Sequence, residues 1–197
     1  MTQSVDIKLF FNFRSPYCYI ASKTMFEVFD RYQANLLWRP LGGWTGRSSP
    51  DRAKVKVPIT RQDVARITRK MGIPMNPPPI TTDPTPAGAG SFLAEKQGVL
   101  RSYIVEMMRR EWAQGQDIGD TGVILQVGES VGLDTAELRE AIESKESLLQ
   151  MERNWEEAQD LGVIGVPSFV IGEEIFWGSD RIEYLDDHLR ELRLTRA

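Results

Sequence analysis

A strand-to-helix junction near the start of the chain constrains the fold more than any other feature. Residues 5–13, VDIKLFFNF, are rich in β-branched and aromatic residues and predict a buried strand. Ser15 and Pro16 then suit a helix start, with serine as N-cap and proline at the first helical position, and we expect the helix to run to about Arg31. Residues 34–40, ANLLWRP, predict a second strand. A strand, a helix and a strand in this order favour parallel pairing of the two strands.

The same junction carries the one cysteine of the chain, Cys18. Ser15 and Cys18 have the spacing of a C-x-x-C redox motif in which serine stands at the first position. A single cysteine excludes an internal disulfide and a cysteine-rich zinc site, and we expect no metal site. Without a partner sulfur, Cys18 is expected to be a buried packing residue.

The middle of the chain predicts helices and no strand. Residues 60–72 have a helical apolar period that stops at a glycine, and the apolar positions of residues 92–112 predict one long helix. The proline-rich residues 74–86 predict an extended connector between them. Helical patterns continue to Gly162.

Strand patterns return only near the end of the chain. Residues 168–178, SFVIGEEIFWG, predict a hairpin in which Gly172 supplies the positive φ of its turn. Residues 179–192 then predict a final amphipathic helix capped by Ser179 or Asp180. The simplest architecture is an α/β fold in which a split sheet, βαβ and ββα, is interrupted by a helical insertion.

The composition narrows the possible functions. The chain has 197 residues and a net charge of −4, which favours neither nucleic acid nor an anionic membrane as partner. We see no apolar run of transmembrane length and no signal-peptide pattern, so we expect a cytoplasmic protein. The one histidine, His188, lies in the last predicted helix, where we expect a solvated or helix-end role. Walker and dinucleotide-binding motifs are missing.

Three stretches carry a resemblance to a known family. They are FFNFRSPYCYIA, residues 10–21; KVKVPITRQDVARITRKMGIP, residues 54–74; and GVIGVPSFVIGEEIFWGSDRIEYL, residues 162–185. In sequence and order they resemble the 2-hydroxychromene-2-carboxylate isomerase family, which is related to kappa-class glutathione transferases and DsbA-like disulfide oxidoreductases. The likeness extends over nearly the whole chain. It implies a thioredoxin-like domain of residues 1–45 and 160–197, with an inserted helical domain of residues 46–159.

The resemblance implies that the thiol comes from bound glutathione and not from the protein. In redox relatives the first position of the turn is the nucleophilic cysteine, whereas the isomerase and kappa families have serine there. Ser15 is therefore the predicted catalytic residue, because its hydroxyl and the free N–H groups at the helix start can stabilise a glutathione thiolate. Pro16 and Tyr17 complete this part of the predicted glutathione site.

Two further segments join the site by resemblance. Val166 and Pro167 correspond to a family motif with a cis proline opposite the S-P turn, where the backbone of Val166 pairs with the cysteinyl part of glutathione. Ser179 and Asp180 are expected to bind its γ-glutamyl end, with Asp180 suited to the ammonium group. We expect Arg181 to orient Asp180 and not to contact the ligand.

The loop of residues 46–56 departs from the family. The family has an asparagine there, near glutathione or the substrate, whereas this chain has Ser48, Ser49 and Pro50. Lys54 and Lys56 match basic family positions, but exposed lysines on a loop are usually solvated. Trp44 and Arg47, with the connector, are predicted to wall the substrate side.

The resemblance implies a glutathione-dependent isomerase that acts on a small aromatic carboxylate by reversible thiolate addition, as a homodimer. Two alternatives stay open at this point. One is a kappa-like transferase or peroxidase that consumes glutathione. The other is a thioredoxin-fold module that either has no catalytic role or acts as a degenerate oxidoreductase through Cys18.

Overall fold

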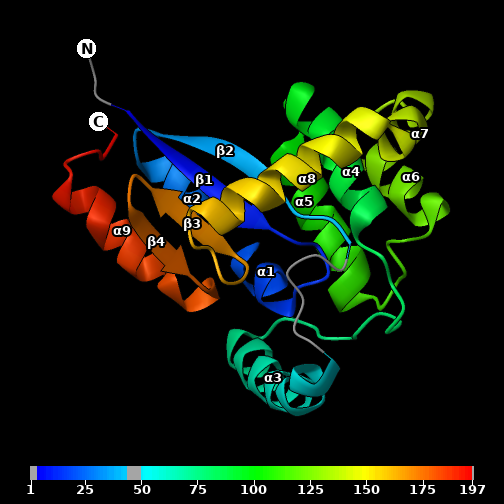
Figure 1. Ribbon diagram of the computed structural model, residues 1–197, viewed down its shortest axis with the longest axis horizontal. Helices are drawn as coiled ribbons and strands as arrows, with labels where there is room; N and C mark the ends of the chain where they lie inside the picture. The colour runs from blue at the N-terminus through cyan, green and yellow to red at the C-terminus, as the bar shows by residue number, and fades with distance from the viewer. Residues whose placement is uncertain (1–3, 44–49, 197) are drawn as a thin grey trace.

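A four-stranded sheet lies at the centre of the computed structural model, which describes residues 4–43 and 50–196 (Figure 1). The strands are β1, Val5–Phe11; β2, Ala34–Pro40; β3, Ser168–Ile171; and β4, Glu174–Trp177. Their order in the sheet is β2-β1-β3-β4. The pairing of β1 with β2 is parallel, as predicted, and β3 is antiparallel to both β1 and β4.

Helices surround this sheet and fill the sequence between β2 and β3. Those outside this interval are α1, Pro16–Ala21; α2, Phe26–Arg31; the short 3-10 helix η2, Ser179–Arg181; and α9, Ile182–Glu191. Those within it are α3, Pro50–Met71; α4, Thr85–Lys96; α5, Leu100–Met108; the π-helix η1, Arg109–Ala113; α6, Thr121–Ser130; α7, Thr135–Glu143; and α8, Lys145–Asp160. The fold is a thioredoxin fold with a helical insertion, as predicted. The domain boundaries given above stay a prediction.

The alternation of side chains along β1 creates a core on each face of the sheet. Ile7, Leu9 and Phe11 belong to the larger core, which α1, α2, α9 and most of the inserted helices complete. Phe10 points to the opposite face, where a smaller core includes Ala158 of α8. Figure 1 accordingly shows α8 crossing one face of the sheet. Of the described helices, none has the length and apolar character needed to cross a membrane.

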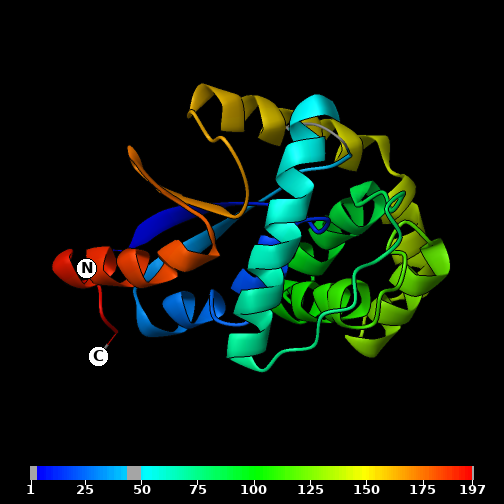
Figure 2. The same ribbon diagram turned by 90° about the horizontal axis from the view of Figure 1, so that it is seen from below.

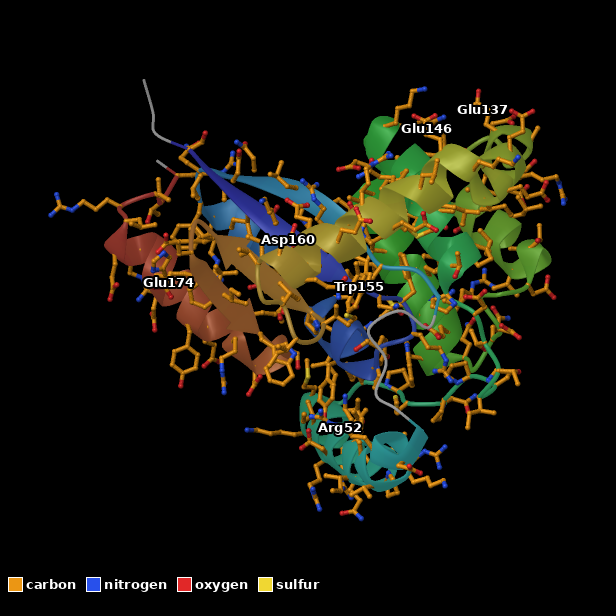
Figure 3. All side chains as sticks on the ribbon, in the orientation of Figure 1. Arg52, Glu137, Glu146, Trp155, Asp160 and Glu174 are labelled. Carbon is orange, nitrogen blue, oxygen red and sulfur yellow. The ribbon has the colours of Figure 1, made fainter. Side chains whose placement is uncertain are left out.

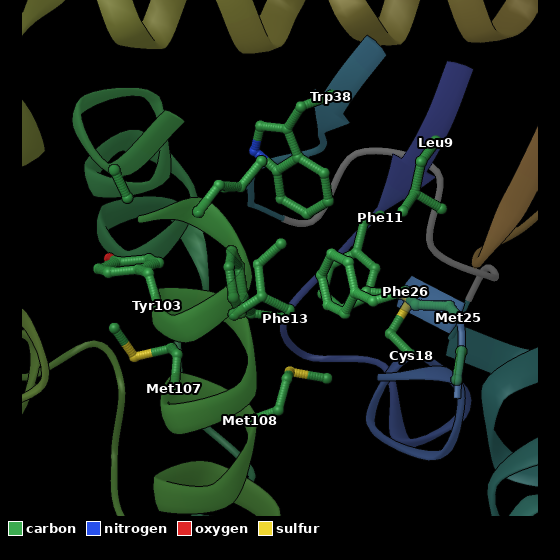
Figure 4. Close-up of a cluster of buried hydrophobic side chains, with 14 of the residues drawn as sticks. Leu9, Phe11, Phe13, Cys18, Met25, Phe26, Trp38, Tyr103, Met107 and Met108 are labelled. Atoms are coloured by element: carbon green, nitrogen blue, oxygen red, sulfur yellow. The ribbon is translucent and has the colours of Figure 1, made fainter. Parts of the chain in front are cut away.

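An aromatic cluster joins the sheet to the insertion (Figure 4). The ring centroids of Phe11 and Trp38 are 5.2 Å apart, and those of Phe13 and Tyr103 are 6.1 Å apart in an edge-to-face pair. The indole N–H of Trp38 donates to Ser91 Oγ of α4 at 2.8 Å. Buried aromatic pairs and a satisfied indole therefore fix α4 and α5 against β1 and β2.

The first strand and the first helix are both shorter than predicted. β1 ends at Phe11, because at Asn12 side-chain hydrogen bonds replace those of the strand backbone. Asn12 Nδ2 donates to Leu41 O, and its Oδ1 accepts from Arg14 N. The predicted helix of residues 16–31 is divided into α1 and α2. At the break, the hydroxyl of Ser22 donates to Tyr19 O at 2.7 Å, which favours a local turn over continued helix.

Two inserted helices also differ from the prediction. The helix predicted over residues 92–112 is α4, α5 and η1, because Gly98 has a φ of +75° and ends α4. Helix α3 begins at Pro50 and not at Thr60, with Pro58 in its interior. Its first half is exposed, so the carbonyl that Pro58 leaves without a donor can be hydrated.

Helix α3 is set apart from the other helices. Figure 2 shows it crossing over α1, and Figure 3 shows the side chains of its first half, including Arg52, on this separate part of the molecule. Its second half packs through Val64 and Thr68, which are buried. Val55 and Ile59 of the first half are exposed.

Candidate functional site

The turn between β1 and α1 has the geometry of a capped helix start. Ser15 is the N-cap of α1, with φ −90° and ψ 120°, and Pro16 occupies the first turn, as predicted. Ser15 Oγ accepts from Cys18 N at 3.3 Å. The backbone N–H of Ser15 donates to Asn12 O at 3.0 Å, so the buried Asn12 fixes the position of the turn.

Ser15 also faces the loop that enters β3. Its Oγ lies 3.5 Å from Val166 O, at the limit of a hydrogen bond, although the two residues are far apart in sequence. The Val166–Pro167 peptide bond is cis, as the resemblance implied. The structure thus brings together the S-P turn and the V-P loop, which the sequence could place side by side only by resemblance.

Tyr17 connects the turn to α3. Its hydroxyl donates to Asp63 Oδ2 at 2.7 Å. Burial, the hydrogen bond to Asp63 and the charges of Asp63 and Asp180 together raise the pKa of Tyr17 to about 12, against a hydrogen bond with Thr60 that lowers it. At neutral pH Tyr17 is therefore a neutral hydrogen-bond donor. Asp63 could not be identified as its partner from the sequence alone.

Ser179 and Asp180 lie in η2, which packs against α1. Gly178 N donates to Pro167 O at 2.9 Å and so joins η2 to the V-P loop. The predicted cap is wrong: neither Ser179 nor Asp180 caps α9 with its side chain, because the 3-10 turn intervenes before Ile182. Asp180 is 68% exposed and forms an ion pair of 2.8 Å with Arg181, the partner expected to orient it.

Cys18 is buried beneath this turn, as predicted (Figure 4). Burial, with a smaller contribution from the charge of Glu111, raises the pKa of its thiol to about 12, against hydrogen bonds from Asn12 and Ser15 that lower it. A neutral, inaccessible thiol is a poor nucleophile. The residue belongs to the core and not to the reacting centre.

The predicted substrate wall is only partly within the described residues. Trp44, Arg47, Ser48 and Ser49 lie outside them. Pro50 begins α3, whose first half exposes Lys54 and Lys56 to solvent, as expected for lysines of this kind. Lys54 Nζ lies 3.5 Å from Asp51 Oδ1 in an exposed pair, which contributes little to stability.

Arg14, one position before Ser15, is a site residue that sequence reasoning missed. Its side chain is 16% exposed, and its Nη1 lies 3.8 Å from Oε1 of Glu111, which is completely buried. The adjacency to Ser15 was the available signal for Arg14. No sequence signal pointed to Glu111, because it is an isolated acidic residue in a segment predicted to be helical.

The polar groups at this site could bind a thiol-containing peptide. Around Ser15 lie its hydroxyl, the first N–H groups of α1, the backbone of Val166 and the carboxylate of Asp180. A hydroxyl and N–H groups can donate to a thiolate, a loop backbone can pair with a peptide, and a carboxylate can bind an ammonium group. No cluster of metal-ligating side chains occurs among the described residues.

Comparison with known proteins agrees with this geometry. The model of the DSBA-like thioredoxin domain family matches residues 6–190. The 2-hydroxychromene-2-carboxylate isomerase of Sphingobium xenophagum is 25% identical over 196 residues, which cover 96% of this chain and 99% of that protein.

Two solved structures share the fold. The structure of 2-hydroxychromene-2-carboxylate isomerase superposes with a TM-score of 0.82 at 20% identity and covers 95% of each chain. The cytosolic disulfide reductase DsbM from Pseudomonas aeruginosa, solved with GSH, has a TM-score of 0.71 at 17% identity, covering 94% of this chain and 100% of that one.

Proposed function

The chain belongs to the family of DSBA-like thioredoxin domains, and from this premise we propose that it is a glutathione-dependent isomerase of aromatic carboxylates. The expected reaction interconverts 2-hydroxychromene-2-carboxylate and trans-o-hydroxybenzylidenepyruvate. Relatives named 2-hydroxychromene-2-carboxylate isomerase that match almost the whole chain support this choice. We expect the protein to be cytoplasmic and to form a homodimer. Sedimentation of the purified protein tests the oligomeric state.

One observation carries the proposal. The position from which a redox relative attacks is held by a serine hydroxyl that faces a cis Val166–Pro167 bond, while the one thiol of the chain, that of Cys18, is buried. The protein has the geometry of a thiol site and no accessible thiol. A thiol from a bound peptide would resolve this contradiction. The lack of an accessible protein thiol also disfavours dithiol oxidoreductase activity.

When bound, glutathione supplies a thiolate that adds reversibly to the conjugated alkene, so that the former double bond can rotate. The task of Ser15 is to donate its hydroxyl proton in a hydrogen bond to the sulfur, which favours the anion. The N–H group of Tyr17, the first after Pro16, adds to this effect, whereas that of Cys18 donates to Ser15 Oγ. Tyr17, held neutral and fixed by Asp63, closes the turn on the side of α3.

The other predicted residues bind the ends of glutathione. Val166 presents its backbone beside Ser15, and the buried Pro167 is tied through its carbonyl to Gly178. This hydrogen bond holds the start of η2 close to the same site, where Ser179 and Asp180 can bind the γ-glutamyl end of glutathione. The exposed ion pair with Arg181 fixes the direction of the Asp180 carboxylate.

The test measures binding first and turnover second. A ligand that binds only the folded state raises its melting temperature, so glutathione should raise it and S-methylglutathione should do so too, whereas the dipeptide γ-glutamylcysteine should be weaker. Isomerisation of trans-o-hydroxybenzylidenepyruvate should then require catalytic glutathione. If glutathione is consumed in proportion to product, the protein is a kappa-like transferase. If neither thiol peptide shifts the melting temperature, the glutathione proposal is wrong.

A further inference from the structure

Ser15 stands between two groups of elements. The V-P loop and η2, which we assign to glutathione, lie on the thioredoxin part of the chain. Arg14 makes its contacts with the insertion instead. Its Nη2 donates to Pro79 O of the connector at 3.0 Å, and its guanidinium carbon lies 5.3 Å from the centre of the Trp112 ring.

The guanidinium of Arg14 is incompletely satisfied. It carries five N–H groups, and within the described residues the bond to Pro79 is the hydrogen bond that it forms. Its Nε is buried and has no partner there. The distance of 3.8 Å from Nη1 to Glu111 Oε1 allows charge attraction but exceeds that of a hydrogen bond. A mostly buried cation with open donors is costly unless a further acceptor completes it.

The guanidinium of Arg14 stays charged in spite of its burial. Burial is the main reason that the pKa of Arg14 is lowered from its ordinary value, and the charge of Arg61 lowers it too, against the carboxylates of Glu111 and Asp117, which raise it. An arginine side chain keeps its proton under such opposing influences. Trp112 is itself fixed, because its indole N–H donates to Phe13 O at 3.1 Å. The guanidinium therefore rests on a rigid ring.

We propose that Arg14 is a specificity-determining residue that binds the carboxylate of the substrate beside the Ser15 hydroxyl. The inference rests on the proposed function, in which the substrate is an aromatic carboxylate. A guanidinium pairs with a planar carboxylate through parallel N–H groups, which fixes orientation as well as affinity. Fixing the carboxylate next to Ser15 would hold the conjugated alkene near the sulfur.

A purely structural role for Arg14 predicts a different result. If the side chain only ties the catalytic turn to Pro79 and Glu111, its loss weakens every ligand alike by loosening the turn. If it binds a carboxylate, the loss is confined to ligands that carry one. The comparison of an acid with its neutral amide therefore separates the two roles.

The experiment uses trans-cinnamate and trans-cinnamamide as unreactive ligands of the full chain saturated with S-methylglutathione. Calorimetry should show that Arg14→Met weakens cinnamate binding about tenfold or more and leaves cinnamamide within about twofold. The matched control is Arg101→Met. The guanidinium carbon of Arg101 lies 5.2 Å from the centre of the Phe26 ring, and its Nη1 lies 2.8 Å from Asp30 Oδ2. This substitution therefore removes a guanidinium in a similar setting away from the site. It should leave both ligands unchanged.

A second measurement needs no Arg14→Met protein, so a folding defect does not decide the matter. In the wild type, the Nε–H resonance of Arg14, assigned by its loss in Arg14→Lys, should move when cinnamate is added and stay when cinnamamide is added. Equal movement with both ligands, or equal loss of both in Arg14→Met, overturns the inference. If S-methylglutathione fails to bind while cinnamate is still preferred, the proposed function fails and the role of Arg14 stands.

Discussion

Replacement of Ser15 by alanine tests the central assignment of the site. In the free protein the Ser15 hydroxyl has weak contacts: Cys18 N lies at 3.3 Å and Val166 O at 3.5 Å, both near the limit of hydrogen bonding. A hydroxyl bound so loosely can turn to a thiolate without losing a strong bond. The same geometry predicts a small structural cost for Ser15→Ala, about 0.5–1 kcal/mol for a weak N-cap.

The expected effect on the thiol is larger than this cost. A hydrogen bond to a charged group contributes about 1.5–3 kcal/mol, and one pKa unit corresponds to about 1.4 kcal/mol. Loss of the Ser15 hydroxyl should therefore raise the pKa of bound glutathione by about one to two units. Because the thiolate is reactive and the neutral thiol is not, turnover at neutral pH should fall. It should recover partly as the pH rises toward the new pKa.

The assay is the ultraviolet absorbance of the thiolate, titrated against pH on the protein saturated with glutathione. Ser144→Ala is a matched control, because Ser144 is the N-cap of α8 and accepts from Ser147 N at 3.4 Å. It should cost similar stability and leave the thiol titration unchanged. Superimposable titrations for wild type and Ser15→Ala would refute the role of the hydroxyl and leave the anion to backbone N–H groups alone.

Three further substitutions have defined outcomes. Asp180→Ala should weaken glutathione binding by calorimetry about five- to tenfold, a modest loss because the carboxylate is 68% exposed; unchanged affinity would remove Asp180 from the site. Cys18→Ala should lower the free energy of unfolding in urea by about 1–2 kcal/mol without changing turnover, and a large loss of turnover would give the thiol a catalytic role. Gly90→Ala should lower the free energy of unfolding by about 1–3 kcal/mol, because its Cβ would lie 2.6 Å from Tyr103 Oη and 2.9 Å from Leu138 Cδ1. Unaltered stability would show that this contact relaxes freely.

The strands could be predicted because their signals are local. β2 has the predicted bounds, and Gly172 has the positive φ expected of the hairpin, +57°. The end of β1 could not be predicted, because it depends on a hydrogen bond that a side chain forms with distant backbone. Asn12 ends β1 through Leu41 O, a carbonyl that comes near it only in the folded chain.

The site shows the same division. Ser15 and Pro16 carry their own signal, since capping is a property of neighbouring residues. The neighbours of this turn carry none: Val166 reaches Ser15 from the loop before β3, and Asp63 reaches Tyr17 from α3, whose first half is predicted as a loop. Val166 could be found from sequence only through the resemblance, and Asp63 could not be found from it at all.

Serine at the first position and a buried sulfur at the second position have the same consequence. A redox pair needs a nucleophilic thiolate at the first position, which Ser15 cannot supply, and burial raises the pKa of Cys18 to about 12, so that Cys18 does not take over this role at neutral pH. The core around Cys18 is completed by aromatic rings and by the insertion, so it favours a neutral sulfur (Figure 4). The interior beneath the turn thus supports packing and not disulfide exchange. Under the proposed function, chemistry at Ser15 then uses the thiolate of bound glutathione, which the half-buried turn would accept.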